Sequence, residues 1–240
     1  MIPNITYLHI KRAIESNRQC FLCTLENEIE RKYIDTYLYE LVMDSSSRQK
    51  IIESRGFCNF HSYKMLIAAS KPESSDGHGM ALVMESVMEK LIQDLNSQKR
   101  HDRSDFREML ADEAKCPACI HLYDFMNTYA KEVIELLSSH NVEFLKLLKE
   151  SKGLCVPHFV GLVHEILDNT SGKSRDIVDF LTEVEETNLS RLDSELADYI
   201  KRQSYEFSAE DRTKVEGVLL RSIGKVAGRQ GMKLGKIIGH

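Results

Sequence analysis

Apolar residues recur along much of this chain at the spacing of one helical face. One stripe begins after Cys20 and a second begins after Cys116, and each continues for about four to five helical turns. Strand-like alternation is weak throughout, and only four prolines interrupt the 240 residues. The pattern therefore predicts an all-α protein. The two stripes consist of Leu22, Leu25, Ile29, Tyr33, Tyr37 and Leu41, and of Leu122, Met126, Tyr129, Val133 and Leu137.

Further helices are expected on either side of the two stripes. A new helix is predicted to start at Cys58 and another at Cys155. Each start follows a glycine, Gly56 or Gly153, that can end the preceding helix in a left-handed conformation. Apolar periodicity also predicts helices over residues 5–14, 80–95 and 177–200, and from Ser208 onward.

Two stretches of the chain are similar to each other. Residues 20–23, Cys-Phe-Leu-Cys, return 96 positions later as Cys-Pro-Ala-Cys, and residues 53–61, Glu-Ser-Arg-Gly-Phe-Cys-Asn-Phe-His, return 97 positions later as Glu-Ser-Lys-Gly-Leu-Cys-Val-Pro-His. Two anchors in the same order with compatible residues between them indicate an internal repeat. We therefore interpret the chain as a tandem duplication of a three-helix repeat stapled by metal.

This interpretation divides the chain into three segments. Residues 1–103 are expected to hold an N-terminal helix and the first repeat, and residues 104–205 the second repeat. Residues 206–240 are expected to form a C-terminal helix and a basic, glycine-rich tail. A highly charged stretch over residues 98–105 marks the connection between the two repeats.

Each repeat carries the ligand pattern C-x2-C, a gap of about 35 residues, and C-x2-H. Both pairs fall at predicted helix N-termini, whose unpaired amides favour thiolates. Four such ligands suit a closed tetrahedral Zn²⁺ site, so two zinc ions per chain are predicted, one within each repeat. Each ion would clamp the starts of two helices together. The predicted ligands are Cys20, Cys23, Cys58 and His61 in the first repeat, and Cys116, Cys119, Cys155 and His158 in the second.

Other chemistries remain open for the same residues. A Cys3His set can hold an iron–sulfur cluster, and a C-x2-C pair at a helix N-terminus can take part in thiol redox reactions. A zinc or redox stress sensor, whose clamp opens on metal loss or oxidation, is a third hypothesis. Disulfides are less expected. The first residues place charges where a secretory signal would be apolar, which favours a cytoplasmic location.

Nothing in the sequence specifies an enzyme. A Ser/His/Asp pattern and a phosphate-binding glycine loop are both missing from the motifs that can be read. His121 and His164 are interpreted as surface or core-edge histidines, because the first repeat has apolar residues at the equivalent positions. Glu183, Glu185 and Glu186 are interpreted as a solvated helix face. A protein that acts by binding an unidentified protein partner is therefore favoured over an enzyme.

Composition and charge add a further expectation for the C-terminal segment. The chain has 32 basic and 37 acidic residues, and none of its apolar runs approaches the ~20 residues needed to cross a bilayer. The segment after Glu216 differs, because it contains no acidic residue. This predicts a weak contact with a polyanion such as RNA or lipid, or a merely solubilising end. Its basic residues are Arg221, Lys225, Arg229, Lys233 and Lys236.

With these motifs the chain resembles a family of bacterial and archaeal proteins of unknown function. Members of that family have an opening helix, C-P-x-C, an aromatic-rich helix, G-F-C-x-x-H, a G-x-A-L-like helix and then a second such copy. This chain departs from the pattern at Phe21, where proline is usual, and at Leu154, which replaces a phenylalanine. The resemblance implies the fold and the cysteine pattern, but no established activity. The matching residues are 5–14, 20–23, 33–41, 56–61, 79–82 and 220–228.

Overall fold

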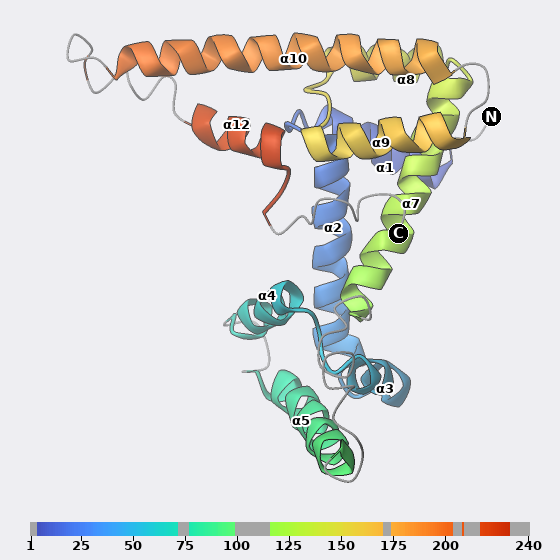
Figure 1. Ribbon diagram of the computed structural model, residues 1–240, viewed down its shortest axis with the longest axis vertical. Coiled ribbons are helices and arrows are strands. Elements are labelled where there is room, and N and C mark those ends of the chain that lie inside the picture. The colour runs from blue at the N-terminus through green and yellow to red at the C-terminus, as the bar shows by residue number, and fades with distance from the viewer. Residues whose placement is uncertain are drawn as a thin grey trace. The chain divides into compact units, whose positions relative to one another are not determined.

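The regular elements of the protein are helices throughout the described chain (Figure 1). The structure is a computed structural model, and the prediction of an all-α fold is confirmed by it. None of the described helices combines the length and the apolarity needed to cross a membrane. The described residues are 4–71, 77–98, 116–169, 174–203, 208 and 217–230.

The chain forms two compact units that do not coincide with consecutive stretches of sequence. Unit 1 consists of Met1–Glu26 and Met126–His240, and unit 2 consists of Asn27–Phe125. Helices α2 (Phe21–Thr36) and α7 (Pro117–Ser138) each contribute to both units. Unit 1 therefore holds the first turns of α2 and the later turns of α7, and unit 2 holds the remainder of each helix.

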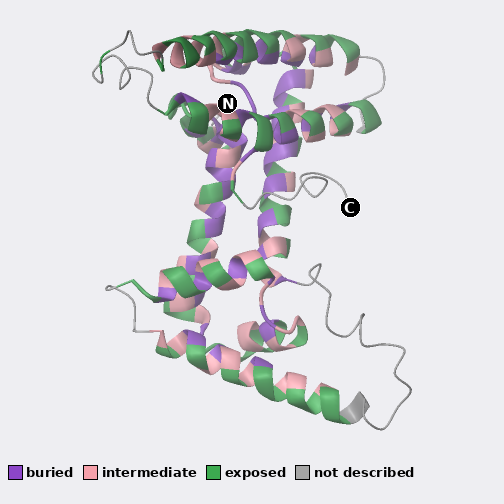
Figure 2. Cartoon of the chain, turned by 60° about the vertical axis from the view of Figure 1, so that its left-hand side comes forward, coloured by how far each residue is buried: buried purple, intermediate pink, exposed green. Residues whose placement is uncertain are grey.

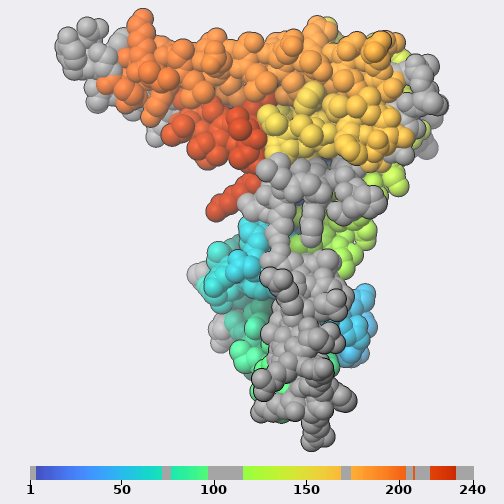
Figure 3. Space-filling model, viewed as in Figure 1, coloured from blue at the N-terminus to red at the C-terminus, as the bar shows by residue number. Residues whose placement is uncertain are grey.

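Unit 1 is built around the long helix α10. Helix α10 contacts α9 and α12, which also contact each other, and α1 contacts α8. In the space-filling view α12 and α9 lie next to each other along α10 (Figure 3). The core of the unit includes Ile10, Val133, Phe144, Leu162 and Ile166, which are all fully buried. The helices are α1 (Ile5–Glu15), α8 (Val142–Glu150), α9 (Val156–Asn169), α10 (Ser174–Arg202) and α12 (Val218–Ala227).

Unit 2 packs its helices around a separate apolar cluster. Helix α5 contacts both α3 and α4. Helix α2 continues directly into a short π-helix, η1. The buried cluster is formed by Ile34, Tyr37, Val42, Ile51, Met65, Ala69, Met80, Val83 and Val87. The helices are η1 (Tyr37–Leu41), α3 (Ser45–Glu53), α4 (Asn59–Ala69) and α5 (His78–Gln98).

The helix positions predicted from periodicity agree with the described helices. The predicted ranges 5–14, 80–95 and 177–200 correspond to α1, α5 and α10. All five residues of the stripe after Cys116 are buried, and buried positions follow one side of the helices in Figure 2. Among the described residues, the helices after Cys20 follow the order α2, η1, α3, α4, α5, and those after Cys116 follow the order α7, α8, α9, α10. The described part of each half thus already exceeds the expected three helices, and the duplication itself stays a prediction.

The short helices α3 and α8 begin in the same way, and a glycine follows each of them at the same spacing. Asp44 caps the first turn of α3 by accepting the Ser47 amide at 2.7 Å, and Asn141 caps α8 by accepting the Phe144 amide at 3.0 Å. Each helix is followed three residues later by a glycine with positive φ, +98° at Gly56 and +70° at Gly153. The predicted left-handed glycines are therefore confirmed, although the helices end slightly before them.

The C-terminal helix differs from its prediction. Residues 209–216, where the helix was expected to begin after Ser208, lie outside the described residues, as do the predicted boundaries after residues 103 and 205. The apolar periodicity expected after Ser208 includes Val218, Leu219 and Val226; Val218 is buried in α12, but Leu219 and Val226 are more than half exposed. Lys225 is fully buried instead. The apolar pattern predicted the wrong buried face because a buried acidic partner holds Lys225 inside.

We expect Gly153→Ala to destabilise unit 1. An alanine Cβ there would lie 2.4 Å from Oε1 of buried Glu185, and the positive φ alone costs about 1 to 2 kcal/mol for a residue with a Cβ. Gly224→Ala is the matched control, because a Cβ at this helical glycine meets nothing within 4 Å. The control should stabilise the helix by about 0.5 to 1 kcal/mol. Thermal unfolding of both variants tests this, and equal midpoints would contradict it.

Candidate metal centres

Four helices begin at the predicted ligands. Helices α2, α4, α7 and α9 start one residue after Cys20, Cys58, Cys116 and Cys155, respectively. The second residue of each pair lies three positions further on, in the first turn of the same helix. Both side chains of a pair therefore lie at the end of the helix where unpaired amides and the helix dipole favour negative charge. The expectation that the ligand pairs lie at helix N-termini is confirmed.

The eight residues gather into two groups that could hold a metal ion. Within each group one ligand atom from each residue lies within 4.8 Å of the others. Site 1 belongs entirely to unit 1, and site 2 belongs entirely to unit 2. Site 1 consists of Cys20, Cys23, Cys155 and His158, and site 2 consists of Cys58, His61, Cys116 and Cys119.

The prediction that each repeat closes its own site is wrong. Each site takes the C-x2-C pair of one half and the C-x2-H pair of the other. The physical reason is the register along α2. His61 contacts Glu30, which lies seven residues and therefore about 10 Å of helix rise beyond Cys23. Helix α4 thus begins too far along α2 for Cys58 to share an ion with Cys23.

The ligand atoms of site 1 surround one point. Nδ1 of His158 lies 3.4 Å from Sγ of Cys20, 3.4 Å from Sγ of Cys23 and 3.2 Å from Sγ of Cys155. The Sγ atoms of Cys23 and Cys155 are 3.5 Å apart. His158, Cys20 and Cys155 are buried, and Cys23 is partly buried.

Site 2 has nearly the same geometry. Nδ1 of His61 lies 3.3 Å from Sγ of Cys58, 3.3 Å from Sγ of Cys119 and 3.7 Å from Sγ of Cys116. The Sγ atoms of Cys58 and Cys119 are 3.7 Å apart. A tetrahedral zinc with bonds of ~2.3 Å to sulfur and ~2.0 Å to nitrogen separates neighbouring ligand atoms by ~3.5 to 3.8 Å. The four residues of each site therefore fit one four-coordinate ion.

A buried carboxylate faces the other nitrogen of each histidine. Nε2 of His61 lies 3.1 Å from Oε1 of Glu30, and Nε2 of His158 lies 4.0 Å from Oε2 of Glu26. Both glutamates are buried positions on α2, four residues apart. Histidines that bind metal commonly direct the second ring nitrogen to such a group, which fixes the tautomer and the ring orientation.

Sequence reasoning missed both of these glutamates. The available signal was their position, because each directly follows a residue of the buried α2 stripe, Leu25 or Ile29. Each carboxylate is in turn paired with a cation. Glu30 pairs with Lys64 of α4, and Glu26 pairs with Arg229, whose Nε lies 2.5 Å from Oε2.

The sites have an electrostatic environment that favours positive charge. Burial lowers the pKa of His61, but the hydrogen bonds to Cys116, Cys58 and Glu30 outweigh it and raise the pKa to about 11. Burial likewise lowers the pKa of His158, but the charge of Cys20 and hydrogen bonds to Cys155 and Cys20 raise it to about 10. Surroundings that hold a proton this firmly also attract a metal cation.

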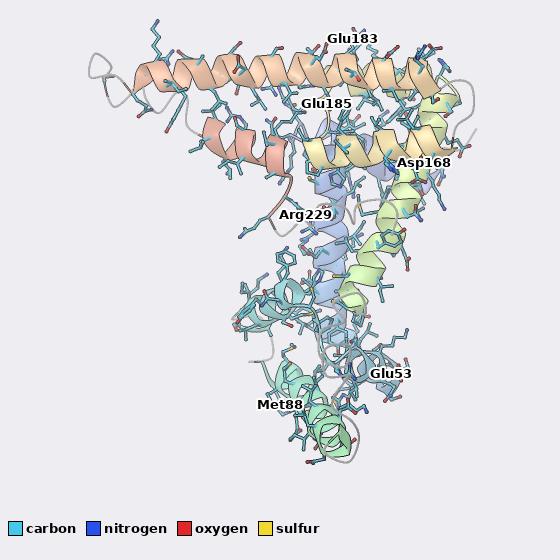
Figure 4. All side chains as sticks on the ribbon, in the orientation of Figure 1. Glu53, Met88, Asp168, Glu183, Glu185 and Arg229 are labelled. Carbon is cyan, nitrogen blue, oxygen red and sulfur yellow. The ribbon has the colours of Figure 1, made fainter. Side chains whose placement is uncertain are left out.

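The interpretation of Glu185 as solvated is wrong. Glu185 is buried on α10, on the side toward α9 and α12, whereas Glu183 and Glu186 are exposed as predicted (Figure 4). Its Oε1 accepts the amide of Leu154 at 2.5 Å, directly before the candidate ligand Cys155. Its Oε2 pairs with Lys225, which comes from the segment expected to contact a polyanion.

The other singled-out histidines lie outside both sites. His121 packs against the rings of Tyr33 and Phe125 in tilted arrangements, and burial lowers its pKa. His164 is exposed and pairs with Asp168 on the same helix at 3.0 Å. Both positions agree with the surface or core-edge interpretation.

The comparisons with known proteins place the chain in one family. A family model described as "Family of unknown function (DUF6062)" matches residues 1–233. No curated protein and no solved structure matches the chain.

Paired substitutions test which ligands share an ion. We expect Cys20→Ala combined with Cys155→Ala to remove one metal ion per chain, because both residues belong to site 1. Cys20→Ala combined with Cys58→Ala should remove both ions, since each site loses a ligand. Elemental analysis of the two double variants measures this. If each repeat bound its own ion, the Cys20/Cys155 variant would lose both ions and the Cys20/Cys58 variant would lose only one.

Proposed function

Since the chain belongs to this family of unknown function, membership brings no activity with it, and we propose a function from the chemistry of the two sites. The protein is a helical zinc protein that binds two Zn²⁺ ions per chain and acts through a protein partner. The ligands are the eight residues of sites 1 and 2. The observation that carries the proposal is the spacing of the ligand atoms, 3.2 to 3.7 Å between the measured pairs, at the start of four helices.

This spacing favours a single ion over an iron–sulfur cluster. Cluster ligands attach to different iron atoms and are separated by the cluster itself, so their sulfur atoms lie further apart than those on one ion. Three thiolates and one imidazole are the ligand types of structural zinc sites. Zinc is therefore favoured, and an iron–sulfur cluster is the alternative that metal analysis tests.

A structural role is favoured over a catalytic one. A catalytic zinc keeps an open position for water or substrate, whereas four protein ligands complete a tetrahedral site. The described ligand groups each provide four ligands. Zinc binding at such sites supplies folding energy, and it would hold α2 to α9 in site 1 and α4 to α7 in site 2. A sensor whose clamp opens when zinc is lost or thiols are oxidised is the second candidate, and the partly buried Cys23 and Cys119 are the observation that favours it.

The tandem duplication is part of the same proposal. Matching caps at Asp44 and Asn141, matching glycines at Gly56 and Gly153, and the shared helix order support it. The division into residues 1–103, 104–205 and 206–240 then describes the evolutionary repeats rather than the compact units. Six thiols in two metal-binding groups also suit a reducing, cytoplasmic compartment.

Partner binding is supported by the outward face of α12. Leu219, Leu220, Ile223 and Val226 of this helix are all more than half exposed. Arg221 and Lys225 pair with Glu195 and Glu185, and Arg229 pairs with Glu26, so these cations are engaged within the chain. An apolar protein surface is therefore a better partner for this face than RNA or anionic lipid.

The first test is metal content and its link to folding. We expect anaerobically purified, untagged protein to contain two zinc ions per chain and no iron, and to be colourless. Cobalt substitution should give the absorption of tetrahedral cobalt thiolates. Removal of zinc by a chelator should lower the thermal midpoint of both units, because binding energy appears as folding energy. Brown protein with iron, or unchanged stability after complete zinc removal, would contradict the proposal.

The second test concerns the outward face of α12. We expect Leu220→Asp combined with Ile223→Asp to reduce binding of an apolar fluorescent dye, while zinc content and thermal midpoint stay unchanged. The intact protein should bind neither poly-uridine nor phosphatidylserine vesicles in a salt-dependent way, because the described cations of the segment are paired. Binding to either polyanion that falls steeply with salt would restore the electrostatic interpretation.

A further inference from the structure

We propose that the C-terminal segment, residues 217–230, is part of site 1, where Arg229 and Lys225 position the carboxylates that support its ligands. The affinity of site 1 for metal then depends on this segment, whereas the affinity of site 2 does not. The inference rests on the proposed metal binding and names what regulates one of the two sites.

Arg229 connects the segment to the ligand His158. It follows α12 after Gly228, which has a φ of +77° and turns the chain away from the helix. The Arg229 side chain is 8% exposed, and its Nε lies 2.5 Å from Oε2 of Glu26. The same Oε2 faces Nε2 of His158 at 4.0 Å. Arg229 therefore places its positive charge against the buried carboxylate that faces the ring of His158.

Lys225 connects the segment to the ligand Cys155. Its fully buried ammonium group pairs with Oε2 of Glu185 and donates to the carbonyl oxygen of Lys152 at 3.1 Å. Oε1 of Glu185 accepts the Leu154 amide, so the carboxylate braces the loop that leads into Cys155. Removal of Lys225 would leave Glu185 buried without its cation.

Site 2 obtains the same support locally. Nε2 of His61 lies 3.1 Å from Glu30, and the cation that pairs with Glu30 is Lys64. Lys64 follows His61 by three residues on the same helix, α4. Site 2 therefore takes its supporting carboxylate and cation from α2 and α4, and no contact with residues 217–230 is needed.

Charge balance explains why the segment affects affinity. Zinc with three thiolates carries one net negative charge, and Glu26 and Glu185 add two more nearby. Arg229 and Lys225 offset both carboxylates. Without these two cations, the metal-bound state of site 1 would contain two buried, uncompensated carboxylates beside a negatively charged metal centre. That state would be destabilised, and the affinity for metal would fall. By linkage, metal bound at site 1 stabilises the docked segment by the same free energy.

The experiment compares Arg229→Gln with the matched variant Lys64→Gln in the full-length, zinc-loaded protein. A chelator titration is followed by cysteine alkylation, and mass spectrometry reports which site has opened. We expect Arg229→Gln to weaken zinc binding about 10-fold or more at site 1, with faster alkylation of Cys20, Cys23 and Cys155 and no change at site 2. Lys64→Gln should weaken zinc binding at site 2 and leave site 1 unchanged. Arg229→Lys should restore much of the loss, because it retains the charge.

A second measurement does not depend on a variant. In the wild-type protein, hydrogen exchange over residues 217–230 should become faster when zinc is removed from site 1. The inference is overturned if Arg229→Gln leaves the zinc affinity of site 1 unchanged or weakens both sites equally. It is also overturned if hydrogen exchange over residues 217–230 does not change when zinc is removed. If the wild-type protein binds no metal, the proposed function fails first, and elemental analysis before the titration distinguishes that outcome.

Discussion

The gathering of thiol, imidazole and carboxylate groups at two buried places is the constraint on which the rest of the structure depends. Each site gathers three thiol sulfur atoms, one imidazole and a carboxylate where water has little access. Such a group is unstable unless positive charge lies nearby, and three sources of positive charge fit around each site. Helix N-termini face the sulfur atoms, a metal cation fits between them, and a lysine or arginine pairs with the carboxylate behind each histidine.

Helix α2 serves both sites and so organises the protein. Its start carries Cys20, Cys23 and Glu26 for site 1, and Glu30, one turn further on, supports site 2. The apolar stripe that begins in the same helix is buried from Leu22 through Tyr37, the first residue of η1, except for the partly buried Tyr33. One helix face thus carries both core residues and the polar groups of two candidate metal centres. A substitution on this face therefore affects packing and charge balance together.

The C-terminal segment shows how a buried charge can reverse the orientation of an amphipathic helix. An apolar face would ordinarily turn inward, but in α12 the inward positions include Lys225, and the leucines turn outward. The ion pair of Lys225 with Glu185 and the pair of Arg229 with Glu26 hold the segment against the rest of unit 1. The outward apolar face is a consequence of that attachment. Charge within the chain thereby creates the surface that we assign to a partner.

The sequence by itself determined the helices and the candidate ligands. Helical periodicity is local, the donor chemistry of Cys and His is local, and a C-x2-C or C-x2-H pair at a helix start needs only a few residues to form. The tertiary structure alone decided which pairs meet and which charges are buried. Cys58 joins Cys116 rather than Cys23, because a helix rises by ~1.5 Å per residue and the register of α4 on α2 sets the distance. Glu26, Glu185 and Lys225 look solvated in sequence and are buried because the partner of each lies far along the chain, where no periodicity can reveal it.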